Sequence, residues 1–243
     1  VMIEGFANVD CGPCPQLTTN LLQLTADPNY GPGRVSFLEF SVSWPNFLDP
    51  FFRANVQENT DRYTTYQVQG APTLVVDGAF VEPPLDFDLM RGAVDAALAG
   101  DPGVLVDVSA DLSAAAAAVS VTLTPLRDID LTGHILYTAL YEELVVVDPA
   151  PGSNGQTEFH HVFRDRVDVP PVLGPLTAGT PQTFEIVLDR GGSDPDNAVV
   201  VAFIQRTSDR AVVQAGSSAV SRDAPAALFA PGPPPATPEG QRP

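Results

Sequence analysis

The pattern of apolar residues changes near Gly100, and this change constrains the fold more than any other feature of the sequence. Before that point, short apolar segments typical of strands alternate with segments in which apolar residues recur at helical spacing. Strands are expected over residues 1–6, 35–40 and 73–76, and helices from Cys14 to Leu24, over 49–59 and over 86–98. This order predicts a central sheet covered by helices, in an α/β domain over residues 1–101.

After residue 101 the apolar residues alternate with polar ones, which is typical of half-buried strands. About seven such segments are separated by clusters of turn residues: Val104–Ser109, Val119–Thr124, His134–Glu142, Phe159–Arg164, Thr183–Leu188, Ala198–Gln205 and Ala211–Ala219. Their density predicts an antiparallel β-sandwich of immunoglobulin or fibronectin type over residues 102–221. Residues 222–243 are rich in proline and alanine, and we expect them to form a disordered tail.

The charge of the chain excludes one class of partner. Its formal net charge is −18, whereas binding to nucleic-acid phosphates needs clustered basic residues. No apolar segment approaches the roughly 18 residues that a membrane-spanning helix needs. The sequence therefore predicts neither a nucleic-acid partner nor a transmembrane helix.

The two cysteines, Cys11 and Cys14, lie between a predicted strand and a predicted helix. As a structural cross-link, such a short loop contributes only roughly 2 kcal/mol, against more than about 4 kcal/mol for a loop of about 100 residues. A Cys-x-x-Cys pair at the start of a helix is instead typical of a redox dithiol, because the helix N-terminus stabilises a thiolate. We therefore expect Cys11 to attack a disulfide and Cys14 to resolve the mixed disulfide.

Two other interpretations of the cysteine pair stay open. A zinc site would need two further ligands, and the three histidines, His134, His160 and His161, all lie in the second region. An inert disulfide, or a pair of idle thiols, would need no partner. Because a dithiol transfers electrons by itself, we expect neither a metal nor a bound cofactor.

The tetrapeptide Cys-Gly-Pro-Cys at 11–14 and the segment Val-Gln-Gly-Ala-Pro-Thr-Leu at 68–74 together resemble the active-site motifs of thioredoxins. The resemblance implies a thioredoxin-like domain in which Pro72 follows a cis peptide bond beside the dithiol. It also implies that the backbone of Ala71 pairs with a substrate chain like an added strand. The two residues between the cysteines would help to position that substrate; they are Gly12 and Pro13.

Three positions decide how closely the chain follows the thioredoxin pattern. Asp10 stands where thioredoxins have tryptophan, and its charge should raise the pKa of the Cys11 thiol. The buried acid that assists proton transfer in that family has a candidate in Glu4, which is either a relay to Cys14 or a solvent-facing residue. The longer spacing between the two motifs indicates an insertion around Trp44, whose ring is either a substrate surface near the dithiol or part of the core.

The chain down to Val220 also resembles a family of exported bacterial lipoproteins related to an outer-membrane protein of twenty-eight kilodaltons. The first strand, the Cys-x-x-Cys-Pro motif, Trp44 and the proline segment carry the resemblance, and weaker matches follow at 136–143, 159–164, 200–205 and 212–215. The resemblance implies a place in the bacterial cell envelope, in the periplasm or attached to the outer membrane, and allows a lipid anchor upstream of Val1.

These features together predict an exported thiol–disulfide oxidoreductase. Its partners would be protein or small disulfides and a second protein that resets the dithiol. The alternative is an envelope lipoprotein with a binding or structural role, which has kept the fold without a physiological redox reaction.

Overall fold

The computed structural model describes residues 1–31 and 33–218. The predicted proline- and alanine-rich tail at 222–243 lies outside the described residues. The first region contains β1 (Met2–Ala7), α1 (Cys14–Thr25), β2 (Ser36–Ser41), α2 (Pro50–Ala54), α3 (Val56–Tyr66), β3 (Thr73–Val76), β4 (Ala79–Phe80) and α4 (Phe87–Leu98). The second contains β5 (Val104–Asp111), β6 (Ala116–Pro125), β7 (Ile129–Asp130), β8 (His134–Val146), β9 (Glu158–Arg166), β10 (Pro175–Leu176), β11 (Gln182–Asp189), β12 (Ala198–Arg206) and β13 (Val212–Ser217).

The helix expected over 49–59 is divided into α2 and α3. Asp49 begins α2 by accepting hydrogen bonds from the backbone N–H groups of Phe51 and Phe52. Asn55 has a non-helical backbone conformation, and its side chain accepts a hydrogen bond from the N–H of Glu58 to begin α3. Because asparagine side chains compete with the helix for backbone hydrogen bonds, Asn55 ends one helix and caps the next.

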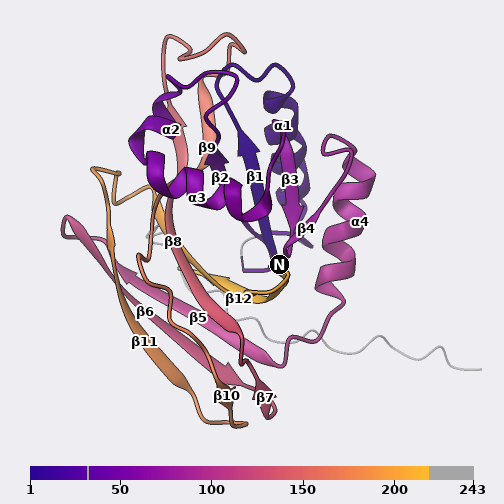
Figure 1. Ribbon diagram of the computed structural model, residues 1–243, viewed down its shortest axis with the longest axis vertical. Helices are drawn as coiled ribbons and strands as arrows, with labels where there is room; N and C mark the ends of the chain where they lie inside the picture. The colour runs from indigo at the N-terminus through magenta and orange to yellow at the C-terminus, as the bar shows by residue number, and fades with distance from the viewer. Residues whose placement is uncertain (32, 219–243) are drawn as a thin grey trace, which may run out of the picture.

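One eight-stranded sheet passes through both regions, in the order β13-β12-β8-β9-β2-β1-β3-β4 (Figure 1). The sequence predicts a separate sandwich after residue 101, but four strands of that region extend the sheet of the first. The junction is a parallel contact between β2 and β9, with Glu39 opposite Val162. β12 is buried along nearly its whole length, so it packs on both faces, as strands inside a larger assembly do.

A three-stranded sheet, β11-β6-β5, completes the sandwich-like part of the molecule at the lower left of Figure 1. Its apolar face meets one face of β8 and β12 in a continuous core that includes Val121, Leu140 and Val200. The pair β10 and β7 forms a further small sheet. The observed architecture is thus mixed α/β with a shared large sheet, rather than two closed domains side by side.

The two faces of β1 and β2 have different partners. On one face, Ile3 and Phe37 pack against α1 and α4 in a core that contains Leu17 and Met90. On the other face, Phe6 and the neighbouring apolar residues pack against side chains of α3, β8, β9 and β12. Together with α3, strands of the second region therefore cover this face of the first region's sheet.

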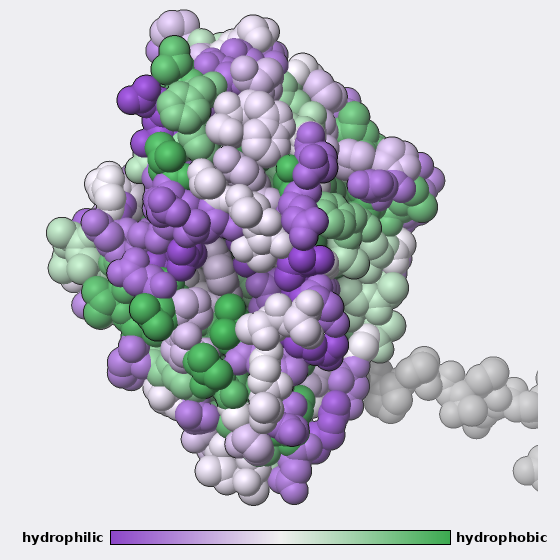
Figure 2. Space-filling model, in the orientation of Figure 1, coloured by the Kyte–Doolittle hydropathy of each residue, from purple (hydrophilic) through white to green (hydrophobic). Residues whose placement is uncertain are grey.

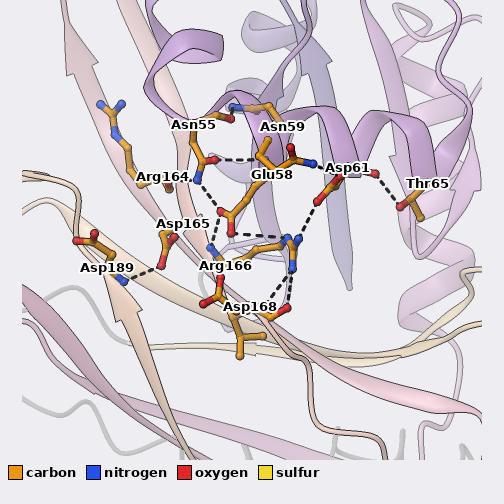
Figure 3. A network of polar contacts seen from close by, with 12 residues as sticks. Asn55, Glu58, Asn59, Asp61, Thr65, Arg164, Asp165, Arg166, Asp168 and Asp189 are labelled. Atoms are coloured by element: carbon orange, nitrogen blue, oxygen red, sulfur yellow. Dashed lines mark hydrogen bonds and ion pairs between the residues drawn. The ribbon is translucent and has the colours of Figure 1, made fainter.

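A polar network joins α3 to β9 on this side (Figure 3). The Nη2 atom of Arg166 lies 2.9 Å from a carboxylate oxygen of Asp61. The backbone N–H of Arg166 donates to the carboxylate of Glu58 over 3.1 Å. Asn55 donates to the carbonyl of Arg164 over 3.1 Å. Burial and the nearby Asp165 raise the pKa of Glu58 to about 7.

Among the described residues, no helix is both long and apolar enough to cross a membrane.

Candidate redox site

Cys11 and Cys14 form a disulfide at the point where β1 leads into α1. The N–H of Cys11 donates to the carbonyl of Asn8 over 2.9 Å, which closes the turn after the strand. α1 starts at Cys14 itself, with proline in its first turn, where a missing N–H costs little. Cys11 thus lies in the turn just before the helix, and its sulfur is bonded to the sulfur of the first helical residue.

The disulfide is almost covered. Cys11 and Cys14 are 4% and 2% exposed, whereas the intervening Gly12 and Pro13 are exposed. Ala7 and Ala71 pack with the two cysteines in a small apolar cluster. The structure therefore brings together both cysteines and Ala71, three of the residues that the sequence singles out.

Pro72 lies at the edge of this cluster. The Ala71–Pro72 peptide bond is cis, and β3 begins immediately after it at Thr73. Surface hollows of about 370 Å³ and about 480 Å³ both border Pro72 and Thr73. Because β4 is only two residues long and pairs with Val75 and Val76, the backbone before Thr73 lies beyond its end.

The inserted segment around Trp44 is held beside the dithiol loop. The side chain of Asn8 donates to the carbonyls of Val42 and Asn46, over 2.8 Å and 3.0 Å. The N–H of Val9 donates to the carboxylate of Asp49 over 2.9 Å. These contacts place the insertion next to the turn that carries Cys11.

Trp44 itself is half-buried against the core on the α3 side, edge-on to Tyr63. The exposed apolar side chains of the insertion are those of Phe47 and Leu48, at 57% and 66%. Hydrophobic and hydrophilic side chains lie side by side at the upper end of the visible face, around α2 and the segment that precedes it (Figure 2). An apolar surface near the dithiol thus exists, but Phe47 and Leu48 contribute more of it than Trp44.

Glu4 is not brought to the cysteines. Its side chain is 1% exposed and lies on the α3 face of β1, opposite the face that holds Ile3 and α1. Arg62 contacts both carboxylate oxygens, at 2.6 Å and 2.8 Å, and the hydroxyl of Tyr66 donates over 2.6 Å. The predicted solvent-facing position is therefore wrong, and the carboxylate of Glu4 contacts Arg62 and Tyr66 on the face opposite to α1.

Glu39 is the buried acid on the α1 face, and the sequence interpretation missed it. It is opposite Gly5 in the β1–β2 register, two residues beyond Phe37, which packs against α1. Burial, and then repulsion by Asp49, raises the pKa of Glu39 to about 8. A glutamate inside the apolar run Ser36–Ser41 was the available signal, because only a special environment keeps a carboxyl group in a fully buried strand.

Asp10 has a partner that lies far away in sequence. Its carboxylate accepts a hydrogen bond of 2.5 Å from the backbone N–H of Ser153, in the loop between β8 and β9. This bond is the main reason that the pKa of Asp10 lies below its usual value. The neighbouring Asn154 donates to the carbonyl of Cys11 over 3.3 Å. Nothing in the local sequence of either segment predicts this contact.

The histidines lie apart from the dithiol cluster. His161 is half-buried against Phe37 and Tyr141, and desolvation of its ring lowers its pKa to about 4. His160 is half-buried beside it. Within residues 1–31 and 33–218, no group of three or more His, Cys, Asp or Glu side chains is arranged to hold a metal ion.

No family model and no curated protein matches the chain. Among solved structures, HBP35 of Porphyromonas gingivalis is similar with a TM-score of 0.70 at 17% identity, over 98% of this chain and 79% of that one. A protein of Agrobacterium tumefaciens solved by X-ray crystallography gives 0.61 at 19% identity, over 89% and 92%. A domain of the outer membrane lipoprotein Omp28 from Porphyromonas gingivalis gives 0.33 at 14% identity, over 49% and 88%. The first two likenesses show that these proteins share the fold.

Proposed function

We propose that this protein is a thiol–disulfide oxidoreductase of the cell envelope, built on a thioredoxin-like domain. One observation carries the proposal: the Cys11–Cys14 disulfide at the junction of β1 and α1 packs against Ala71, directly before a cis proline. The location in the envelope rests on the resemblance of the sequence to exported lipoproteins. HBP35 of Porphyromonas gingivalis shares the fold.

The reaction exchanges one disulfide for another. In the reduced protein, the thiolate of Cys11 attacks one sulfur of a substrate disulfide, forms a mixed disulfide and releases the other substrate sulfur as a thiolate. The thiolate of Cys14 then attacks the sulfur of Cys11, which restores the Cys11–Cys14 bond and releases the second substrate thiolate. Two electrons pass from the protein to the substrate, and the reverse sequence oxidises a substrate dithiol. No cofactor takes part in either direction.

The surroundings of Pro72 suit an extended polypeptide. The backbone of Ala71 and Pro72 lies beyond the end of β4, where an added strand could hydrogen-bond to Ala71. The two hollows that border Pro72 offer space for side chains on either side of such a strand. Gly12 and Pro13 are exposed, so a bound chain can contact the part of the motif that lies between the two cysteines.

The main alternative is a binding or structural envelope protein whose dithiol has no physiological substrate. The low exposure of both cysteines favours this alternative, because a substrate disulfide must reach the sulfur of Cys11. Its ligand would bind to the loops of the second region.

The deciding experiment traps the intermediate. Cys14→Ala leaves Cys11 free to form a mixed disulfide that cannot be resolved, and envelope extract from cells that express this variant is separated without reductant. We expect discrete adducts that disappear on reduction and are missing from the Cys11→Ser, Cys14→Ala double variant. No adduct above the double variant, together with equal insulin reduction by the wild type and Cys11→Ser, would favour the alternative.

A further inference from the structure

The loop between β8 and β9, residues 147–157, reaches across to the turn that carries the dithiol. In Figure 1 it forms the top of the molecule, beside the loop that follows β1. Three consecutive residues each receive one hydrogen bond from it. The N–H of Ser153 donates to Asp10, and Asn154 donates its backbone N–H to the carbonyl of Val9 and its side-chain amide to the carbonyl of Cys11.

The loop is shaped for this contact. A Cβ atom at Gly152 would overlap the carbonyl oxygen of Val9, so only glycine allows the two backbones to approach this closely. The side-chain oxygen of Asn154 accepts from the N–H of Gln156 over 2.9 Å, which fixes the orientation of its amide toward Cys11. The loop therefore contacts the turn through defined partners rather than through a few surface atoms.

The charges around Cys11 make this contact chemically relevant. Asp10 is its direct neighbour, Asp49 binds the N–H of Val9, and Glu39 interacts with Asp49. In the described part of the chain none of these three acids forms an ion pair. Asp148 and Glu158, near the two ends of the loop, are exposed. Asp10, whose pKa is lowered, therefore places a negative charge directly beside Cys11, and this charge opposes the formation of a thiolate there.

We propose that the β8–β9 loop is a working part of the dithiol site, in which Ser153 and Asn154 are positioning residues that set the pH at which Cys11 reacts. The N–H of Ser153 points its positive end at the carboxylate of Asp10 and offsets part of the field that this carboxylate exerts on Cys11. The amide of Asn154 holds the carbonyl of Cys11 and so fixes the backbone before α1. The significance of this role rests on the proposed function, but the role itself does not.

Gly152→Ala tests the proposal, because the added methyl group would push the loop away from Val9. Gly174→Ala is the matched control, since a Cβ atom there meets nothing within 4 Å. Both changes are made in the Cys14→Ala background, where Cys11 is the single thiol, and the rate of alkylation of this thiol by iodoacetamide is measured against pH. Circular dichroism checks that each variant is folded.

We expect Gly152→Ala to raise the midpoint of this profile by about half a unit to one unit, with a rate near neutral pH about three- to tenfold lower. Gly174→Ala should match the parent. Once Asp10→Asn has removed the charge, Gly152→Ala should shift the midpoint by a smaller amount, because only the contact of Asn154 with Cys11 is then lost.

An unchanged midpoint in Gly152→Ala, or a shift of equal size in the Asp10→Asn background, would overturn the proposal. If Gly152→Ala does not fold, Asn154→Ala replaces it, because it removes the bond to Cys11 and adds no atom; it should raise the midpoint by a smaller amount. The titration needs no substrate. A shifted profile without trapped adducts would therefore remove the proposed function and leave this inference standing.

Discussion

The two faces of the β1–β2 sheet each bury a glutamate, and the two are treated in opposite ways. On the α3 face, Glu4 is held by Arg62 and Tyr66, so its charge is compensated where it is buried. On the α1 face, no hydrogen bond or ion pair to the carboxylate of Glu39 is found among the described residues, and Asp49 adds repulsion. A buried charge that is compensated by a partner holds the packed elements together, whereas an uncompensated buried acid changes its protonation near neutral pH.

The difference between the two glutamates is tested most directly by removing the charge of Glu4. Glu4→Gln would leave the guanidinium of Arg62, which is 4% exposed, without its counter-charge. We expect a loss of about 3 to 5 kcal/mol in the free energy of unfolding at pH 7, measured by urea denaturation. Asp88→Asn, which breaks an exposed pair with Arg91, should cost less than about 1 kcal/mol. A similar loss of unfolding free energy in the two variants would show that the buried Glu4–Arg62 pair stabilises the fold no more than an exposed pair does.

The uncompensated acid should show itself in the pH dependence of stability. The pKa of Glu39 is about 8 in the folded protein, against the ordinary glutamate value of 4.5 in the unfolded chain. Between these two pH values the folded state therefore binds more protons than the unfolded state. The contribution of Glu39 to stability therefore falls as pH rises through this range. Glu39→Gln should be more stable than the wild type by roughly 2 to 4 kcal/mol at pH 9 and nearly equal to it at pH 5. A constant difference between the two pH values would contradict this assignment.

The smallest effect concerns the dithiol itself. Asp49 interacts with Glu39 and binds the N–H of Val9, two residues before Cys11, so the charge of Glu39 should be felt at the thiol. In reduced Cys14→Ala protein, Glu39→Gln should lower the midpoint of Cys11 alkylation by about half a pH unit. Glu58→Gln, which changes an acid on the α3 face, is expected to leave it unchanged. Equal shifts from both variants would show that the sheet does not separate the two faces electrostatically.

The sequence was sufficient where local pattern decides the structure. β3 occupies the predicted residues 73–76, α4 with its cap Asp86 occupies the predicted range 86–98, and the cysteines lie where a strand leads into a helix. Each of these depends on neighbours within a few residues. The division of the 49–59 helix at Asn55 also had a local cause, since asparagine favours helix ends, but the apolar spacing concealed it.

The remaining features depend on residues that are distant in sequence. The pairing of β2 with β9 places Glu39 opposite Val162. The apolar pattern of a strand predicts which residues are buried, but it does not predict which strand lies beside it. For the same reason the partners of Glu4 were unpredictable: Arg62 lies 58 residues further along the chain, and Gln205, which binds Arg62, belongs to β12. The contact of Ser153 with Asp10 spans 143 residues.

The shared eight-stranded sheet also means that the peptide connection between α4 and β5 contributes little to holding the two regions together. β8, β9 and β12 cover the apolar α3 face of the first region, and the Arg62 network crosses the same boundary. Proteolytic nicking in the connection between α4 and β5 would therefore yield two fragments that stay together as one particle. Either fragment made alone would expose that apolar face and aggregate.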